Sequence, residues 1–116
     1  MKAQNGKKFY ITTAIPYVNA RPHLGHALEF VQADVLRRYH RMQGARTPLL
    51  SGADENALKN VRAAEAAGKP IQEFVDEYAR YFFQLADVLD VSFDRFVKGS
   101  DKKRHFPASQ ELWRRC

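Results

Sequence analysis

The most constraining feature of this sequence is a strand-like run that passes directly into a long helical pattern. Residues 9–14 are aromatic and β-branched, which favours a buried strand, and Pro16 ends that run. Residues 24–43 form an amphipathic pattern, and Gly44 supplies the usual helix stop. The loop between them faces a helix N-terminus, where unpaired N–H groups and the helix dipole favour an anion. This arrangement predicts an α/β fold with an anion-binding loop.

One face of the helix predicted over residues 24–43 is expected to be buried. Its apolar residues recur at spacings of three and four: Leu24, Leu28, Val31, Val35, Tyr39 and Met42. Arg37, Arg38 and Arg41 are expected to face away from this stripe. A second short apolar run, near residues 47–52, predicts a buried strand parallel to the first. The strand, the crossover helix and the second strand then form a right-handed βαβ unit.

The rest of the chain alternates between helical and strand-like patterns without an internal repeat. Residues 54–67 and 70–89 predict two helices, and residues 103–115 a last amphipathic segment. The helix over residues 70–89 carries a stripe typical of a core-facing helix: Ile71, Phe74, Tyr78, Phe82, Leu85 and Leu89. Residues 93–98 predict a third strand. A doubly wound sheet normally has more strands, so the expected fold is incomplete.

Composition sets the outer limits. A chain of 116 residues suits one domain, and 19 Lys+Arg against 13 Asp+Glu give a net charge of +6, which favours anionic partners such as nucleotides or RNA. The charges are spread along the chain, so a solvated surface explains them equally well. The lone Cys116 excludes an intramolecular disulfide and a cysteine-based zinc site within this chain. We expect residues 1–8 to be flexible, and we expect no signal peptide, no membrane partner and a cytoplasmic location.

Two histidines lie where the first helix is predicted to begin. His23 and His26 are three residues apart, with Gly25 between them. Imidazole N–H donors at a helix N-terminus suit phosphate oxygens, and a glycine lets a nucleotide approach the backbone closely. The alternatives are a pair of exposed or core histidines, or an i,i+3 metal pair. No further metal ligands accompany the pair, so we predict a nucleotide phosphate site and no metal.

These residues support a family resemblance. Residues 8–99 resemble the N-terminal half of the catalytic domain of methionyl-tRNA synthetases, which are class I aminoacyl-tRNA synthetases. The class I signature is a His-x-Gly-His tetrad, here residues 23–26, which nucleotidylyltransferases and several other class I synthetases share. Three further stretches are similar to the methionine enzymes: Ala14-Ile15-Pro16-Tyr17-Val18-Asn19, Leu50-Ser51-Gly52-Ala53-Asp54-Glu55, and residues 62–68 followed by Phe74-Val75-Asp76.

The resemblance implies a Rossmann-type (HUP-like) parallel sheet with flanking helices, the incomplete first half of a catalytic domain. It also implies activation of methionine with ATP and Mg²⁺, followed by transfer to tRNA. The residues it assigns are His23 and His26 to catalysis, Asn19, His23, Gly25 and His26 to ATP, and Ala14, Ile15, Tyr17 and Asp54 to methionine. From the residues alone, Asp54 could instead be a helix N-cap, and Tyr17 and Asn19 could be turn residues.

The sequence departs from the family in two ways. Asn56-Ala57 stands where most members have His-Gly, and the chain carries no Lys-Met-Ser-Lys-Ser sequence, connective insertion with zinc ligands or anticodon-binding domain. We therefore expect residues 9–116 to be the N-terminal part of a nucleotide-binding catalytic domain, inactive in isolation. Two alternatives stay open: a small nucleotidylyltransferase with the same tetrad, and a non-enzymatic fragment that binds RNA or a partner.

Overall fold

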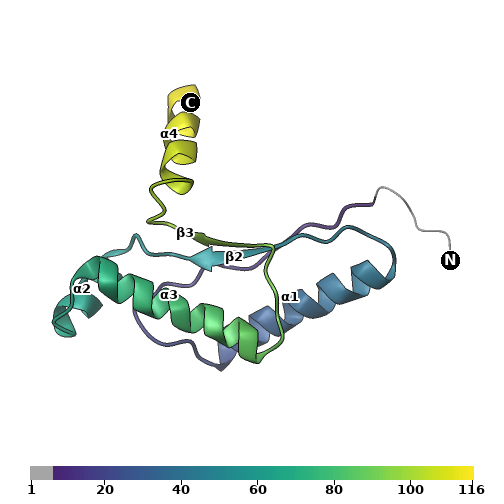
Figure 1. The fold of residues 1–116 in the computed structure, drawn as a ribbon, viewed down its shortest axis with the longest axis horizontal. Coiled ribbons are helices and arrows are strands. Elements are labelled where there is room, and N and C mark those ends of the chain that lie inside the picture. Colours follow the sequence, from purple (N-terminus) through teal and green to yellow (C-terminus); the bar gives the residue numbers. More distant parts are fainter. Residues whose placement is uncertain (1–6) are drawn as a thin grey trace.

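Three parallel strands form the centre of the computed structural model, which describes residues 7–116. Strands β1 (Ile11–Thr12), β2 (Leu49–Ala53) and β3 (Arg95–Lys98) lie in the order β1-β2-β3 (Figure 1). Ile11 is opposite Leu49, and Leu50 is opposite Arg95. The predicted parallel sheet is confirmed, and each strand is shorter than its predicted range.

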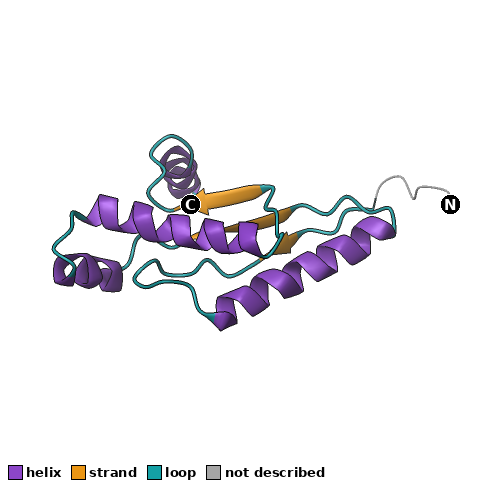
Figure 2. Ribbon diagram, turned by 60° about the horizontal axis from the view of Figure 1, so that its bottom comes forward, coloured by secondary structure: helices purple, strands orange, loops and turns teal. Residues whose placement is uncertain are grey.

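Four helices connect and flank the strands: α1 (Leu24–Met42), α2 (Leu58–Ala66), α3 (Ile71–Val88) and α4 (His105–Arg115). Helices α1 and α3 lie on one side of the sheet, and α4 extends away on the other (Figures 1 and 2). Helix α1 begins next to His23, as predicted. Helix α2 begins four residues later than the predicted range of 54–67. The α/β class with a parallel sheet and flanking helices is confirmed.

The core lies between the sheet and helices α1 and α3. Phe30 of α1, Leu49 of β2 and Phe82 of α3 are almost fully buried. The stripe predicted for α3 largely faces this core, and Ile71 at its start is half-exposed instead. At Gly52, a Cβ would lie 2.3 Å from the carbonyl oxygen of Val97, so the close approach of β2 and β3 requires a glycine there.

The prediction for the buried face of α1 is wrong. The apolar stripe is exposed, from 88% at Leu24 to 39% at Val31. The buried residues of α1 are instead Phe30, Ala33, Asp34 and Arg37, which lie on a different face of the helix. Two of these four are charged, and a hydrophobic periodicity cannot identify a face that is buried through ion pairing.

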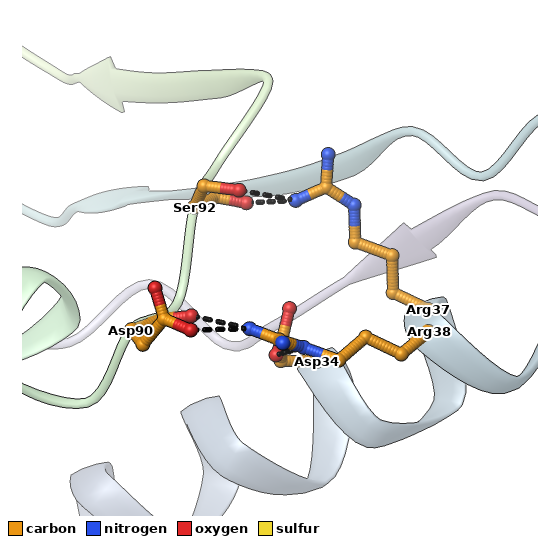
Figure 3. Close-up of polar contacts among 5 residues, drawn as sticks. All are labelled: Asp34, Arg37, Arg38, Asp90 and Ser92. Carbon is orange, nitrogen blue, oxygen red and sulfur yellow. Dashed lines mark hydrogen bonds and ion pairs between the residues drawn. The ribbon is translucent and has the colours of Figure 1, made fainter. Parts of the chain in front are cut away.

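Arg37 ties α1 to the segment between α3 and β3. It faces away from the apolar stripe, as predicted, but its face of the helix is the buried one. Its guanidinium donates to the carbonyl oxygen and hydroxyl of Ser92 (Figure 3), and it lies 2.9 Å from a carboxylate oxygen of Asp94. Asp94 also accepts the N–H of Leu49 at the start of β2. One buried arginine therefore joins α1, through Asp94, to the sheet.

Arg38 makes a second, more exposed connection beside the first. It donates to Asp34 one turn earlier on α1, at 2.5 Å, and to the carbonyl and carboxylate oxygens of Asp90 (Figure 3). Asp90 has a positive φ of 54°, a conformation that aspartate tolerates better than most residues. Arg38 and Arg41 are exposed, as predicted.

At the N-terminal end of the described residues, the backbone pairs with the loop before β2. The Arg46 N–H donates to the Lys7 carbonyl, and the Phe9 N–H donates to the Arg46 carbonyl. The segment 1–8 was expected to be flexible; residues 1–6 lie outside the described residues, and Lys7 and Lys8 are paired with Arg46. Within residues 7–116, no helix is long and apolar enough to cross a membrane.

Candidate active site

The carboxyl ends of the three parallel strands meet at one edge of the sheet, where α/β proteins bind their ligands. The loop after β1 and the residues after β2 are joined there. The Asp54 N–H donates to the Pro16 carbonyl at 2.8 Å, and Tyr17 and Asp54 form an isolated parallel bridge. The fold thus places Ile15, Tyr17 and Asp54, predicted from distant parts of the sequence, side by side.

A cavity of about 490 Å³ opens between this edge and α4. Ile15, Ala53 and Val97 give it an apolar wall, and Asp54 supplies a carboxylate. Its remaining lining comes from Asn56, Gly99, His105, Phe106, Ser109 and Gln110. An apolar wall with one carboxylate suits a small molecule that carries both an apolar chain and a cationic group. Of the predicted methionine-binding residues, Ile15 and Asp54 line this cavity, whereas Ala14 and Tyr17 do not.

His23 and His26 cap the N-terminus of α1. Nδ1 of His23 accepts the N–H of Gly25 at 3.0 Å, and Nδ1 of His26 accepts the N–H of His23 at 3.1 Å. The two rings lie with their centroids 3.8 Å apart. The pair therefore forms a reciprocal capping box, in which imidazole nitrogens replace the usual oxygen acceptors.

This cap determines which ring nitrogen of each histidine carries the proton. Because both Nδ1 atoms accept hydrogen bonds, a neutral ring at either position is protonated at Nε2. Burial, and to a lesser extent His23, lower the pKa of His26, while Glu29 opposes this effect. His26 is therefore a neutral N–H donor at neutral pH. Neither Nε2 has a hydrogen-bond partner among residues 7–116, so both donors are available to a ligand.

Gly25 is required by the cap itself. A Cβ at this position would lie 2.8 Å from Cε1 and 3.0 Å from Nδ1 of His23. The sequence suggested that this glycine allows a nucleotide to approach the backbone; the structure adds that it makes room for the capping ring. His26 is also held from the side, because its ring packs edge-on against the buried ring of Phe82 at 5.0 Å.

Asp54 is not the N-cap of α2, so that alternative is wrong. Helix α2 begins at Leu58, its N-cap residue is Ala57, and Asp54 Oδ1 accepts the N–H of Asn56, at 3.3 Å, which is not a helix cap. The φ of Ala57 is −137°, an ordinary extended value. Alanine therefore occupies this position without backbone strain, and Asn56 lines the cavity.

Ala14 and Asn19 lie on the loop between β1 and α1. The Ala14 N–H donates to Glu29 of α1 at 2.7 Å, which ties the loop to the helix. Asn19 is half-buried. Neither residue lines the cavity described above, and neither do the two histidines. The histidines occupy the start of α1, at the same edge of the sheet.

The structure brings further polar residues to this edge that the sequence did not single out. Lys59 places its ammonium 3.3 Å from the centroid of the Tyr17 ring, a cation–π contact. Glu55 and Asn60 are buried beside Asp54. In the sequence, the one signal that could have pointed to Glu55 is its position next to Asp54. Among residues 7–116, no group of three His, Cys, Asp or Glu side chains is placed to hold a metal ion.

Comparison with known proteins gives one consistent answer. The sequence profile of the family described as "tRNA synthetases class I (M)" matches residues 9–116. The methionine–tRNA ligase of Mycobacterium leprae is 42% identical over 109 residues, which cover 94% of this chain and 20% of that protein. The methionine–tRNA ligase of Thermotoga maritima is 43% identical over 105 residues, which cover 90% of this chain and 16% of that protein.

Solved structures agree. The methionyl-tRNA synthetase of Mycobacterium tuberculosis, bound by methionyl-adenylate, matches with a TM-score of 0.89 and 42% identity, covering 94% of this chain and 21% of that chain. A leucyl-tRNA synthetase of Agrobacterium radiobacter K84 in a ternary complex has a TM-score of 0.82 at 22% identity, which shows a shared fold alone. The chain spans about a fifth of the length of the curated methionine–tRNA ligases it matches.

Proposed function

Because the chain belongs to the class I tRNA synthetase (M) family, we propose that it provides the first half of a methionine-activating site. In that reaction a carboxylate oxygen of methionine attacks the α-phosphorus of ATP, and the bond to the departing pyrophosphate breaks. Methionyl-adenylate and pyrophosphate are formed, and the methionyl group is then transferred to tRNA. The observation that carries this proposal is the histidine cap at the ligand-binding edge of the sheet, with two unused N–H donors.

The two histidines suit the charge that develops in this reaction. Negative charge grows on phosphoryl oxygens in the transition state, and preorganised donors stabilise it more than a mobile solvent does. His23 and His26 are fixed by the cap, with Nε2–H free, and the N-terminus of α1 adds its dipole. We assign both histidines to catalysis and to ATP binding. Gly25 and Asn19, at the helix start and on the loop before it, are assigned to ATP binding alone.

The cavity suits methionine. We propose that Asp54 receives the α-ammonium group and that Ile15 forms part of the apolar wall for the thioether side chain. Tyr17 and Ala14 are assigned to the same site because their backbone lies on the loop that is bonded to Asp54. The Mycobacterium tuberculosis relative, bound by methionyl-adenylate, supports this assignment.

ATP, as its Mg²⁺ complex, and tRNA are the remaining substrates that we propose for the synthetase reaction. We propose that the described chain alone does not complete that reaction. Catalysis of this kind depends on groups from both sides of the nucleotide closing on it, and the cavity is open to solvent. A cytoplasmic location stays a prediction.

The proposal is tested by a graft. Residues 9–116 replace the matching segment of the Mycobacterium tuberculosis methionyl-tRNA synthetase, and methionine-dependent ATP–pyrophosphate exchange is measured beside the unaltered relative and the isolated chain. We expect exchange by the graft and none by the isolated chain. A graft that folds, as judged by circular dichroism and gel filtration, but does not exchange would refute the proposal. Methionine-dependent exchange by the isolated chain would refute the proposal that the chain alone does not complete the activation step.

A further inference from the structure

Glu55, next to Asp54, is a buried carboxylate with an unusual set of partners. Its side chain is 2% exposed, and Oε2 accepts the N–H of Ser100, in the turn after β3, at 2.8 Å. Lys98, the last residue of β3, places Nζ 3.3 Å from Oε1 and also pairs with Asp76 of α3. Burial lowers the pKa of Lys98, but Asp76 and Glu55 outweigh it and raise the pKa overall, so Lys98 stays charged.

An ion pair between a buried carboxylate and a partly exposed lysine is poor evidence for stability alone. Desolvation of two charges offsets much of their attraction, and apolar residues of similar volume often stabilise a fold better. The value of such a pair lies in the geometry that it imposes. Here the pair joins the residue after Asp54 to the end of the neighbouring strand.

The backbone of Asp54 is held on each side by a hydrogen bond. Its N–H donates to the Pro16 carbonyl, and its carbonyl oxygen accepts from Nδ2 of Asn60, which is fully buried, at 2.9 Å. The parallel bridge to Tyr17 keeps the backbone at Asp54 extended. Successive side chains of an extended backbone point in opposite directions. Glu55 is drawn inward to Lys98 and Ser100, whereas Asp54 lines the cavity.

We propose that Glu55 is a positioning residue: by anchoring to Ser100 and Lys98, it sets the direction in which Asp54 presents its carboxylate to the amino group of the substrate. This inference rests on the proposed function, because it concerns the methionine site. Glu55 itself does not touch the substrate. Its loss therefore weakens methionine binding without altering the chemistry at the α-phosphorus.

The test uses the active graft and compares the methionine KM, the ATP KM and kcat per active site, with active sites counted by the burst of adenylate formation. Glu55→Ala is expected to raise the methionine KM about tenfold, the effect of losing a charge-assisted hydrogen bond. Glu55→Gln keeps an acceptor for the Ser100 N–H and is expected to raise the methionine KM about threefold. The ATP KM and kcat per active site are expected to stay within about twofold.

Asp76→Asn is the matched control, because it removes the other carboxylate of the same lysine, on the α3 side. It is expected to leave the methionine KM unchanged. Glu55→Gln is nearly isosteric and is the decisive variant if Glu55→Ala does not fold. A Glu55→Gln graft with the parent methionine KM, or an equal rise in Asp76→Asn, would overturn the inference. Lack of exchange by the parent graft would instead refute the proposed function.

Discussion

His23 and His26 hold each other in place: the backbone N–H of His23 donates to Nδ1 of His26, and the two rings lie with centroids 3.8 Å apart. The residues proposed to bind phosphate are therefore also the residues that cap α1. Function and helix stability are coupled at this point, and substitutions can separate them.

Replacing His23 or His26 with alanine in the graft is expected to reduce pyrophosphate exchange roughly 10²–10³-fold, as for the loss of one transition-state donor. His23→Ala also removes an N-cap and should lower the free energy of unfolding of the isolated chain by about 1 kcal/mol. His23→Asn is the control, because asparagine caps helices well but lacks an imidazole. It should preserve stability and still lose exchange. Parent-like exchange by His26→Ala would exclude the proposed role.

The pH dependence of stability should carry a signature of His26. Because the pKa of His26 is lower in the folded protein than its ordinary value of 6.5, the unfolded chain binds the proton more readily. The contribution of neutral His26 to the free energy of unfolding is therefore fully present above about pH 6.5 and is lost as the pH falls below it. Denaturant titrations at several pH values from 7.5 to 5 should show a smaller decline for His26→Gln than for the parent chain. Equal declines would contradict the assignment.

Gly25→Ala should have opposite effects in two backgrounds. In the parent chain, the new Cβ meets the His23 ring, so the cap is disturbed and stability falls. In a His23→Ala background the obstacle is gone, and alanine should stabilise the helix by up to about 1 kcal/mol relative to glycine. A double-mutant cycle by denaturant unfolding measures this coupling. Additive effects would show that the ring does not require the glycine.

Arg37→Ala is expected to lower the free energy of unfolding by about 2–3 kcal/mol, because a buried guanidinium and its hydrogen bonds are lost while Asp94 stays partly solvated. Arg41→Ala, on the same helix but exposed, is the control and should change stability by less than about 0.5 kcal/mol. Denaturant unfolding of the isolated variants checks both values. Comparable losses of stability in the two variants would show that the buried contacts of Arg37 contribute no more than an exposed arginine does.

The exposed apolar stripe of α1 should make the isolated chain self-associate. Contiguous apolar surface of this kind marks an interaction site or an aggregation liability. Sedimentation velocity between about 5 and 200 µM should show growth in mass with concentration, and Leu28→Glu with Val35→Glu should suppress it without loss of helical signal. A chain that stays monomeric across this range would contradict the prediction.

The strand–loop–helix order, the parallel sheet and the core face of α3 could be predicted from the sequence because each is encoded by local patterns. The buried face of α1 could not be predicted in this way. An apolar periodicity shows which residues would avoid water, but α1 turns Asp34 and Arg37 toward the interior, and Arg37 finds Ser92 and Asp94 more than fifty residues away. Such pairing leaves no local trace in the sequence.

The residues of the candidate site were likewise only partly predictable from the sequence. His23, Gly25 and His26 belong to one short motif, and their shared place at the start of α1 was predictable. Glu55, Lys98 and Ser100 come together only because β2 and β3 are neighbours, and the sequence did not identify them. Roles of Ala14, Ile15, Tyr17, Asn19 and Asp54 in substrate binding stay predictions.

The contact between Arg37 and Asp94 also bears on how the chain folds during its synthesis. The two residues are 57 positions apart, and Asp94 is also the residue that receives the Leu49 N–H. At translation rates of about 5–20 residues per second, roughly 3–11 s separate the addition of Arg37 from that of Asp94. During that interval the inner face of α1 has no partner for its guanidinium. The link from α1 through Asp94 to β2 can therefore form only after all three segments have been synthesised.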